Sequence, residues 1–231
     1  MRKGTIYTLA LFALLFSLEA QKQQIDIDDF TRIEFAIPGK LYIKQGERTS
    51  VEVECSADAM NKIDFEMRGD RLRIRNKEQS WFSWGSSGLN DVKVYVTMRQ
   101  IEEIGVSGSG DVFGSGLIET GHVNLAVSGS GYMALSLKAE DMSVAISGSG
   151  KLKLDGNGED MDLDISGSGS VSGVELKVVS LNASISGSGK CEIEVSNEID
   201  ANISGSGHVY YKGNPEKIRS NSSGSGKVRH Y

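Results

Sequence analysis

The segment VAISGSGKLKLDGNGEDMDLDISGSGSV, residues 144–171, holds two copies of Ser-Gly-Ser-Gly whose starts lie 19 residues apart. On its own, this tetrapeptide is typical of a flexible linker. It occurs seven times in the chain, with spacings of 21, 19, 19, 20, 18 and 19 residues. The copies start at Ser107, Ser128, Ser147, Ser166, Ser186, Ser204 and Ser223. A period this narrow indicates a repeat architecture.

The residues on both sides of each tetrapeptide alternate between apolar and polar types. Val or Ile precedes six of the seven copies, Ser222 being the exception, and further apolar residues stand two and four positions earlier. The second residue after each copy is also apolar, as at Met133 and Leu152. This period of two, rich in β-branched residues, predicts half-buried strands on both sides of the glycines. A disordered linker would not keep that phase.

The repeated glycines therefore need a geometric reason, because glycine in a strand costs about 0.5–1 kcal/mol relative to alanine. The reason is either a positive φ at a corner or a backbone approach that leaves no room for a Cβ. We expect the following glycines to be structural: Gly108, Gly110, Gly129, Gly131, Gly148, Gly150, Gly167, Gly169, Gly187, Gly189, Gly205, Gly207, Gly224 and Gly226. Whether the serines between them face outward or inward is left open by the sequence.

About 19 residues suit one turn of a parallel β-helix, whose coils stack at a spacing of about 4.8 Å. The competing interpretation is an antiparallel meander with the tetrapeptides as hairpin turns. A meander of this length would form a very long sheet, and such sheets curl or split. The sequence therefore favours an all-β fold, a single-stranded parallel β-helix with coils of about 19 residues.

The first twenty residues predict export. A basic start, Arg2 and Lys3, is followed by an apolar stretch and by Ala20 at a cleavage position. This is the pattern of a secretory signal peptide over residues 1–20, with a membrane anchor as the competing interpretation. We expect no integral membrane segment after cleavage, and a location in the periplasm, at the cell surface or outside the cell. The chain of 231 residues has a net charge of -6 and no dense basic run, so nucleic acid is excluded as a partner.

Residues 21–100 lack the tetrapeptide but are rich in strand patterns. The segment FTRIEFAIPGKLYIKQG predicts two strands around Pro38-Gly39, and IDFEMRGDRLRIRNK predicts a hairpin that turns at Gly69-Asp70. We expect this region to consist of irregular coils that cap the stack, with a separate domain as the alternative, and residues 101–231 to form the β-helix of seven repeats.

The chain resembles a family of secreted bacterial proteins, the putative auto-transporter adhesin, head GIN domain family. The segments that carry the resemblance are FTRIEFAIPGKLYIKQG, RGDRLRIRNK, VKVYVTMRQIEEIGVSGSGDV and the repeated ISGSG blocks, over about residues 27–229. The resemblance implies a right-handed β-helix at or outside the cell envelope. It implies little chemistry, because the molecular role of the family is poorly defined.

The stretch QSWFSWGSS places three aromatic residues, Trp81, Phe82 and Trp84, within four positions of a loop. These side chains either plug the end of the core or form an exposed patch that binds sugar rings, lipid or protein. A second candidate surface is a wall of outward serine hydroxyls, which could hydrogen-bond a glycan or order water. The alternative is that small polar residues merely suit a tight wall.

Other motifs have simpler explanations. Residues 155–160, DGNGED, offer oxygen ligands at three loop positions but lack the glycine and the acid of a calcium loop. Arg68-Gly69-Asp70 spells an integrin-binding tripeptide, which a hairpin turn explains fully. The acids Asp160, Asp162 and Asp164 alternate on one strand, as in a solvated face. Cys55 and Cys191 both lie on an apolar phase, which favours two buried thiols over a disulfide.

No catalytic constellation, cofactor motif or metal-ligand spacing is present in the sequence. The three histidines, His122, His208 and His230, form no pair with metal-ligand spacing. We therefore expect a non-enzymatic protein without a cofactor, an adhesin or structural scaffold that contacts a glycan, lipid or protein at the envelope. The alternative is a carbohydrate- or lipid-binding module that uses the Trp81–Trp84 loop or the serine wall, and a polysaccharide-active enzyme is the weakest hypothesis. The oligomeric state is not indicated.

Overall fold

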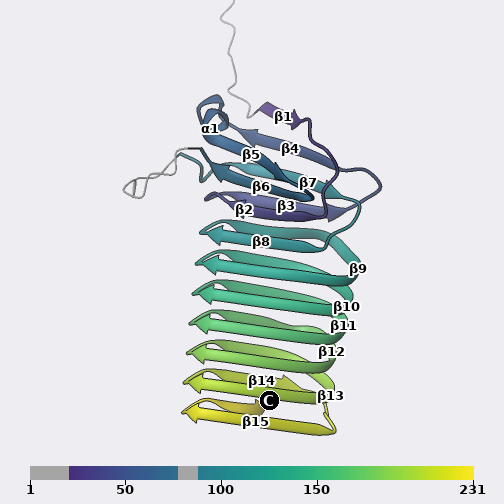
Figure 1. Cartoon of the computed structure of the whole chain (residues 1–231), viewed down its shortest axis with the longest axis vertical. Helices are drawn as coiled ribbons and strands as arrows, with labels where there is room; N and C mark the ends of the chain where they lie inside the picture. The colour runs from purple at the N-terminus through teal and green to yellow at the C-terminus, as the bar shows by residue number, and fades with distance from the viewer. Residues whose placement is uncertain (1–20, 78–87) are drawn as a thin grey trace, which may run out of the picture.

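The computed structural model describes residues 21–77 and 88–231, and these form a parallel β-solenoid of about seven coils spaced about 19 residues apart. Figure 1 shows the strands of successive coils stacked above one another along the long axis of the molecule. The coils pair in parallel with equivalent positions side by side, so that Ile146 lies beside Ile165 and Ser147 beside Ser166. The predicted parallel β-helix is confirmed, and the antiparallel meander is wrong for the repeats.

Each complete coil is one long strand that contributes to two layers. Its first part follows the tetrapeptide and its second part leads into the next one. Five strands have this form: β9 (Asp111–Gly129), β10 (Tyr132–Gly148), β11 (Lys151–Gly167), β12 (Ser170–Gly187) and β13 (Lys190–Gly205). The last strands are β14 (His208–Lys212) and β16 (Lys227–His230) in the first layer and β15 (Lys217–Gly224) in the second.

The core between the two layers is filled by the apolar residues of the alternating pattern. In β11, Leu152, Leu163 and Ile165 are each only 1–2% exposed. The column that precedes the tetrapeptide repeats the same side chain in four successive coils: Ile146, Ile165, Ile185 and Ile203. One hydrophobic cluster runs from Phe30 to Val209, and its burial is the main source of stability.

The tetrapeptide forms one corner of every coil, and its two glycines occupy different environments. The first glycine has a positive φ in all seven copies, from 94° at Gly108 to 130° at Gly224. Its backbone also stacks closely on the coil before, because a Cβ added to Gly148 would lie 2.6 Å from the Gly129 oxygen. Ser149 N donates a hydrogen bond to that same oxygen at 2.8 Å, so the corners are linked backbone to backbone.

The second glycine is buried in every copy and lies over an apolar side chain of the coil before. A Cβ added to Gly131 would lie 2.5 Å from Cγ1 of Val106 and 2.8 Å from the Gly110 oxygen. Of the two reasons considered for the glycines, positive φ and backbone approach both apply to the first glycine. Lack of space for a side chain applies to the second.

The region before the repeats also consists of coils, but their order in space differs from their order in the chain. The strands are β1 (Gln21–Ile25), β2 (Arg32–Ala36), β3 (Lys40–Gln45), β4 (Ser50–Cys55), β5 (Ile63–Arg68), β6 (Arg71–Asn76), β7 (Lys93–Met98) and β8 (Glu103–Gly108). The coil made of β2 and β3 lies between the coil of β6 and β7 and the coil of β8 and β9, with parallel pairing on both sides.

Antiparallel strands complete the N-terminal end of the stack. β4 pairs with β7 and β1, while β5 and β6 form the predicted hairpin, with Gly69 at a φ of 63° in its turn. The short helix α1 (Ala57–Lys62) lies between β4 and β5, and the Ser56 hydroxyl accepts its N-terminal cap bond from Ala59 N at 3.2 Å. The expected pair of strands around Pro38-Gly39 is confirmed as β2 and β3.

Candidate functional site

The two layers of the solenoid present two different outer surfaces. We call the outward side chains of the second layer the small-residue face, because it consists of serine, alanine, asparagine and aspartate. From β9 to β13 its members are Asn124, Ala126, Ser128, Ser143, Ala145, Ser147, Asp162, Asp164, Ser166, Asn182, Ser184, Ser186, Asp200, Asn202 and Ser204. None has more than four side-chain heavy atoms, so this face is flat.

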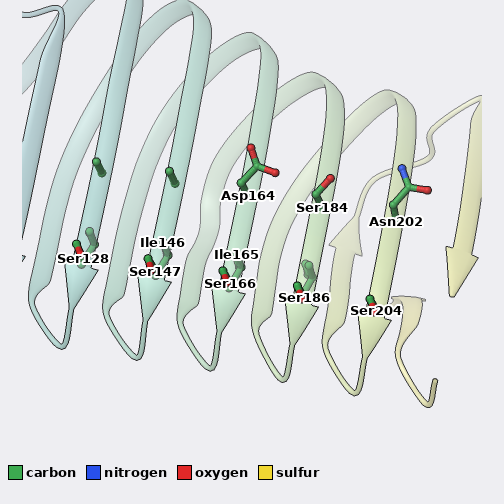
Figure 2. Close-up of a pocket in the computed structure, with 14 residues that line it drawn as sticks. Ser128, Ile146, Ser147, Asp164, Ile165, Ser166, Ser184, Ser186, Asn202 and Ser204 are labelled. Atoms are coloured by element: carbon green, nitrogen blue, oxygen red, sulfur yellow. The ribbon is translucent and has the colours of Figure 1, made fainter. Parts of the chain in front are cut away.

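The small-residue face carries a shallow groove that crosses the coils. One part has a volume of about 460 Å³ and runs along the serine column from Ser128 to Ser204. An adjoining part of about 400 Å³ follows Asn124, Asp162 and Asn182. Figure 2 shows two rows of labelled side chains. The row near the corner contains Ser128, Ser147, Ser166, Ser186 and Ser204, and the row beside it contains Asp164, Ser184 and Asn202. The groove is therefore a continuous surface and not a pocket of one coil.

The serines of the tetrapeptides point outward, which resolves the orientation that the sequence left open. From Ser128 onward, the first serine of each copy is exposed, and the second is exposed in all seven copies. The column of hydroxyls lies along one edge of the groove. Its members are hydrogen-bond donors and acceptors directed at solvent.

Of the three acids on this face, Asp200 contacts Arg219 at 3.7 Å, whereas Asp162 and Asp164 have no counter-ion among the described residues. Asn182 Nδ2 donates a hydrogen bond to Asp162 Oδ1 at 3.0 Å. Asp160 and Asp141 are neighbours in the next column and are likewise exposed. The middle of the small-residue face therefore carries negative charge that faces solvent.

The first layer presents a different surface, which we call the lysine-aromatic face. Its outward side chains include Tyr95, Tyr42, Phe113, Tyr132, Lys151, Lys153, Lys190, His208 and Tyr210. The Tyr42 and Tyr95 rings stack with centroids 5.1 Å apart, and Tyr42 and Phe113 stack at 5.6 Å. Because these rings face one another along the stack, they turn mainly their edges to solvent. They are therefore poorly placed to stack on a sugar ring.

A polar groove lies where the N-terminal coils meet the corner of β9. It has a volume of about 580 Å³ and is lined by residues that include Arg32, Gln45, Glu102 and His122. Gln45 Nε2 donates to the Glu119 carbonyl at 3.0 Å and bridges the two regions. The sequence offered no signal for this groove, because its residues lie up to 92 positions apart, from Arg32 to Asn124. Asn124 also lines the groove of the small-residue face, so the two grooves are contiguous.

Several residues singled out in the sequence do not gather into a site. Trp81, Phe82 and Trp84 lie outside the described residues. In the segment 155–160, which lies within β11, Gly156 has a φ of 116°, and Asp155 Oδ2 accepts a hydrogen bond from Ser136 at 2.6 Å. Among residues 21–77 and 88–231, no group of three His, Cys, Asp or Glu is placed to hold a metal ion.

The two cysteines are free thiols in different environments. Cys191 is fully buried in β13, and burial raises the pKa of its thiol to about 12. Cys55, at the end of β4, is partly buried, and burial raises the pKa of that thiol as well. Neither thiol has the lowered pKa of a catalytic cysteine.

No helix of the described part is long and apolar enough to cross a membrane. Among solved structures, a putative adhesin from Bacteroides fragilis superposes with a TM-score of 0.84 at 21% identity, over 93% of this chain and 98% of that one. A putative adhesin from Parabacteroides merdae gives 0.71 at 22% identity, over 91% and 95%. A putative lipid binding protein from Parabacteroides distasonis gives 0.73 at 20% identity, over 91% and 96%.

At these identities the solved structures establish the fold alone. No curated protein matches the chain significantly. The sequence profile of one family covers residues 29–215, which is most of the solenoid and includes six of the seven tetrapeptides. The chain therefore belongs to the family described as putative auto-transporter adhesin, head GIN domain.

Proposed function

We propose that this protein is an exported, non-enzymatic contact protein of the cell envelope, an adhesin-like scaffold whose small-residue face is the binding surface. The observation that carries the proposal is the groove, which follows the serine column over five coils from Ser128 to Ser204. Membership of an adhesin-type family and the solenoid fold support this role. A rigid stack of coils presents an extended surface of this kind without any moving part.

The shape and chemistry of the face suit a partner that is flat or extended. Its side chains are too small to enclose a ligand, and its hydroxyl, amide and carboxylate groups recur at the coil spacing of about 4.8 Å. A hydroxyl-rich polymer such as a glycan chain can form several hydrogen bonds along such a column. The unpaired Asp162 and Asp164 disfavour anionic partners, including anionic lipid and acidic polysaccharide.

Export and the organisation of the N-terminal region belong to the same proposal. Residues 1–20 act as a signal peptide, so that the mature chain begins at Gln21 in the periplasm, at the surface or outside the cell. Residues 21–100 act as the cap of the stack, because antiparallel strands and α1 close the end that parallel coils would leave open. The alternative of a lipid- or sugar-binding loop at Trp81–Trp84 stays a hypothesis for that loop.

The test compares two alanines of the same strand. Ala145 of β10 lies in the groove, whereas Ala134 points outward from the opposite face of the same coil. Purified residues 21–231 and the variants Ala145→Gln and Ala134→Gln are applied to a glycan array and to vesicles of neutral and anionic lipid. We expect binding to neutral glycans that Ala145→Gln weakens about tenfold and Ala134→Gln leaves unchanged.

Absence of any binding, or equal binding by all three proteins, would overturn the assignment of the small-residue face. Binding only to anionic vesicles would overturn the preference for a neutral partner. Cleavage of an arrayed polysaccharide would contradict a non-enzymatic role. Thermal unfolding of both variants serves as the control for folding, and because both side chains are solvent-facing we expect changes within about 0.5 kcal/mol.

A further inference from the structure

The strand β11 carries lysines on one face and aspartates on the other, and neither set is neutralised by a residue that the structure describes. Lys151 and Lys153 point outward on the lysine-aromatic face, and Asp162 and Asp164 point outward on the small-residue face. All four are exposed, and within the described residues none of them forms an ion pair. The coil therefore carries two unpaired lysines on one side, followed by Asp155, which accepts a hydrogen bond from Ser136, and two unpaired aspartates on the other side.

The other lysines of β9 to β13 are each paired with a glutamate within the described residues. Lys138 contacts Glu119 at 3.2 Å, and Lys177 contacts Glu194 at 3.3 Å. Further along, Glu198 contacts Lys217 at 2.9 Å and Arg219 at 2.7 Å. Lys151 and Lys153 are the exceptions among these lysines, and the unpaired Asp162 and Asp164 lie at the same level of the stack.

The two faces are also complementary in shape in the two coils that precede β11, those of β9 and β10. On the lysine-aromatic face, Phe113 of β9 and Tyr132 of β10 form a ridge with ring centroids 5.8 Å apart. On the opposite face, the same two strands carry Ala126 and Ala145, which form a flat apolar floor in the groove. A ridge and a floor that could accept it thus occur at the same level of the stack.

We propose that a second copy of this chain docks side by side with the first, with the lysine-aromatic face of one copy against the small-residue face of the next. The inference rests on the proposed function in one respect, because it assigns a partner to the small-residue face. Two copies with parallel axes and no stagger bring Lys151 and Lys153 toward Asp164 and Asp162, and the aromatic ridge toward the alanine floor.

The lysine positions on one face and the aspartate positions on the other differ in distance from the corner by one outward position, which a lysine side chain can span. The two lysines occupy the first and second outward positions after the corner, and the two aspartates occupy the second and third before it. Both pairs are two residues apart on a strand, which corresponds to about 6.6 Å. The small-residue face offers no long side chain that would hold the sheets apart. Because the two faces differ, the contact is heterologous and adds copies in an open row instead of closing as a two-fold dimer.

The contact depends on charge and therefore on salt. Two pairs of opposite charge at a solvent-exposed contact are screened strongly as the ionic strength rises from about 0.15 M to about 1 M. We expect sedimentation velocity of residues 21–231 to show an average mass that increases with protein concentration at the lower salt. At the higher salt, the dissociation constant should rise about tenfold.

Charge reversal provides the decisive experiment. The variant Lys151→Glu/Lys153→Glu is acidic on both faces, and the variant Asp162→Lys/Asp164→Lys is basic on both faces. Each variant alone should self-associate about tenfold more weakly than the natural chain or not at all. When the two variants are mixed, opposite charges face each other again, and we expect association to return. All four positions are exposed, so circular dichroism and thermal unfolding should be nearly unchanged.

The proposal is overturned if the natural chain stays monomeric at every concentration, or if the two variants self-associate as the natural chain does. It is also overturned if the mixture remains dissociated, because the contact then involves other faces. These results are separable from those of the array experiment. Self-association should weaken with Ala134→Gln as well as with Ala145→Gln, since the two alanines lie on the two contacting faces, whereas glycan binding should respond to Ala145→Gln alone.

Discussion

The N-terminal coils and the tetrapeptide coils hold their strands together in different ways. Over residues 32–103, charged side chains of neighbouring strands form ion pairs, such as Arg73 with Glu34 at 3.2 Å and Lys93 with Glu54 at 2.7 Å. Over β10 to β13, the outward residues of the second layer are small, and the corner glycines let the backbones of neighbouring coils hydrogen-bond directly. One region uses its outer side chains for its own cohesion, whereas in the second layer of the other region the serines and alanines of the groove are free and only some Asn and Asp side chains are engaged, such as Asn182 with Asp162.

This difference explains why the candidate surface lies over the repeats. A face whose side chains are engaged in ion pairs must break those pairs to bind a partner. A face of serine and alanine loses little side-chain entropy on binding, because its short side chains have few rotamers to restrict. The repeats gain stability from the buried columns and the corners, so their outer surface is available for contact.

The largest effect is expected from the first glycine of a corner. Gly148→Ala places a side chain at a φ of 107°, and its Cβ would lie 2.6 Å from the Gly129 oxygen. Conformational strain of about 1–2 kcal/mol adds to a backbone clash that cannot relax without moving a corner. We expect a loss of at least about 3 kcal/mol in the free energy of unfolding, measured by denaturant titration.

Three other glycines separate the two causes. Gly131→Ala introduces the clash without the positive φ, whereas Gly116→Ala introduces a φ of 96° with no atom within 4 Å of the added Cβ. Gly121→Ala introduces neither and is the matched control, which we expect to be neutral or to stabilise by about 0.5 kcal/mol. The expected order of loss is Gly148, Gly131, Gly116 and Gly121. A loss at Gly121 as large as that at Gly148 would contradict the corner explanation.

The two corners of each coil show which parts of the structure the sequence could predict and which it could not. The tetrapeptide repeat and the alternating pattern around it were sufficient to predict the strands, the coil length and the position of the first corner. The opposite corner has no residue type common to all coils, because Glu140-Asp141 recurs as Glu159-Asp160 but is replaced by Val179-Ser180 in the next coil. Without that second signature, the sequence could not show which outward residues share a face. Asp160, Asp162 and Asp164 were predicted to point outward, but their position opposite Lys151 and Lys153 was not.

The order of the N-terminal coils was unpredictable for a related reason. The coil of β2 and β3 lies between two coils that follow it in the chain, and Phe35 is paired with both Ile74 and Val106. Such pairing depends on which buried side chains fit one another across long sequence separations. No local pattern in residues 32–45 distinguishes a coil inside the stack from a coil at its end.

A smaller effect is expected from the ion pairs of the N-terminal region. The pKa of Glu54 is lowered, chiefly because Lys93 donates a hydrogen bond to it at 2.7 Å and also because the Tyr95 hydroxyl does so at 3.1 Å. A carboxyl with a lowered folded pKa contributes stability above its ordinary value of 4.5, and loses that contribution as the pH falls through the folded value.

Glu54→Gln should therefore cost up to about 1 kcal/mol at neutral pH, and the difference from the natural chain should vanish in acid. The control is Glu52→Gln on the same strand, because the one ion pair of Glu52 in the described part of the chain is with Lys22 at 4.0 Å and both side chains are about half exposed. We expect no measurable change there. The measurement is the free energy of unfolding as a function of pH, and a Glu54→Gln difference that grows on acidification would contradict the assigned sign.

The smallest effect on stability is expected in the serine column. Ser147 is exposed and forms no hydrogen bond within the described residues, so Ser147→Ala should change the free energy of unfolding by less than about 0.5 kcal/mol. Ser136 of the same strand is the comparison, because its hydroxyl donates to Asp155 Oδ2 at 2.6 Å and its loss should cost about 1 kcal/mol. If Ser147→Ala instead cost about 2 kcal/mol, its hydroxyl would be needed by the coil itself. The serine column would then be part of what holds the repeats together, and the contrast with the ion-paired N-terminal coils would fail at the surface proposed for binding.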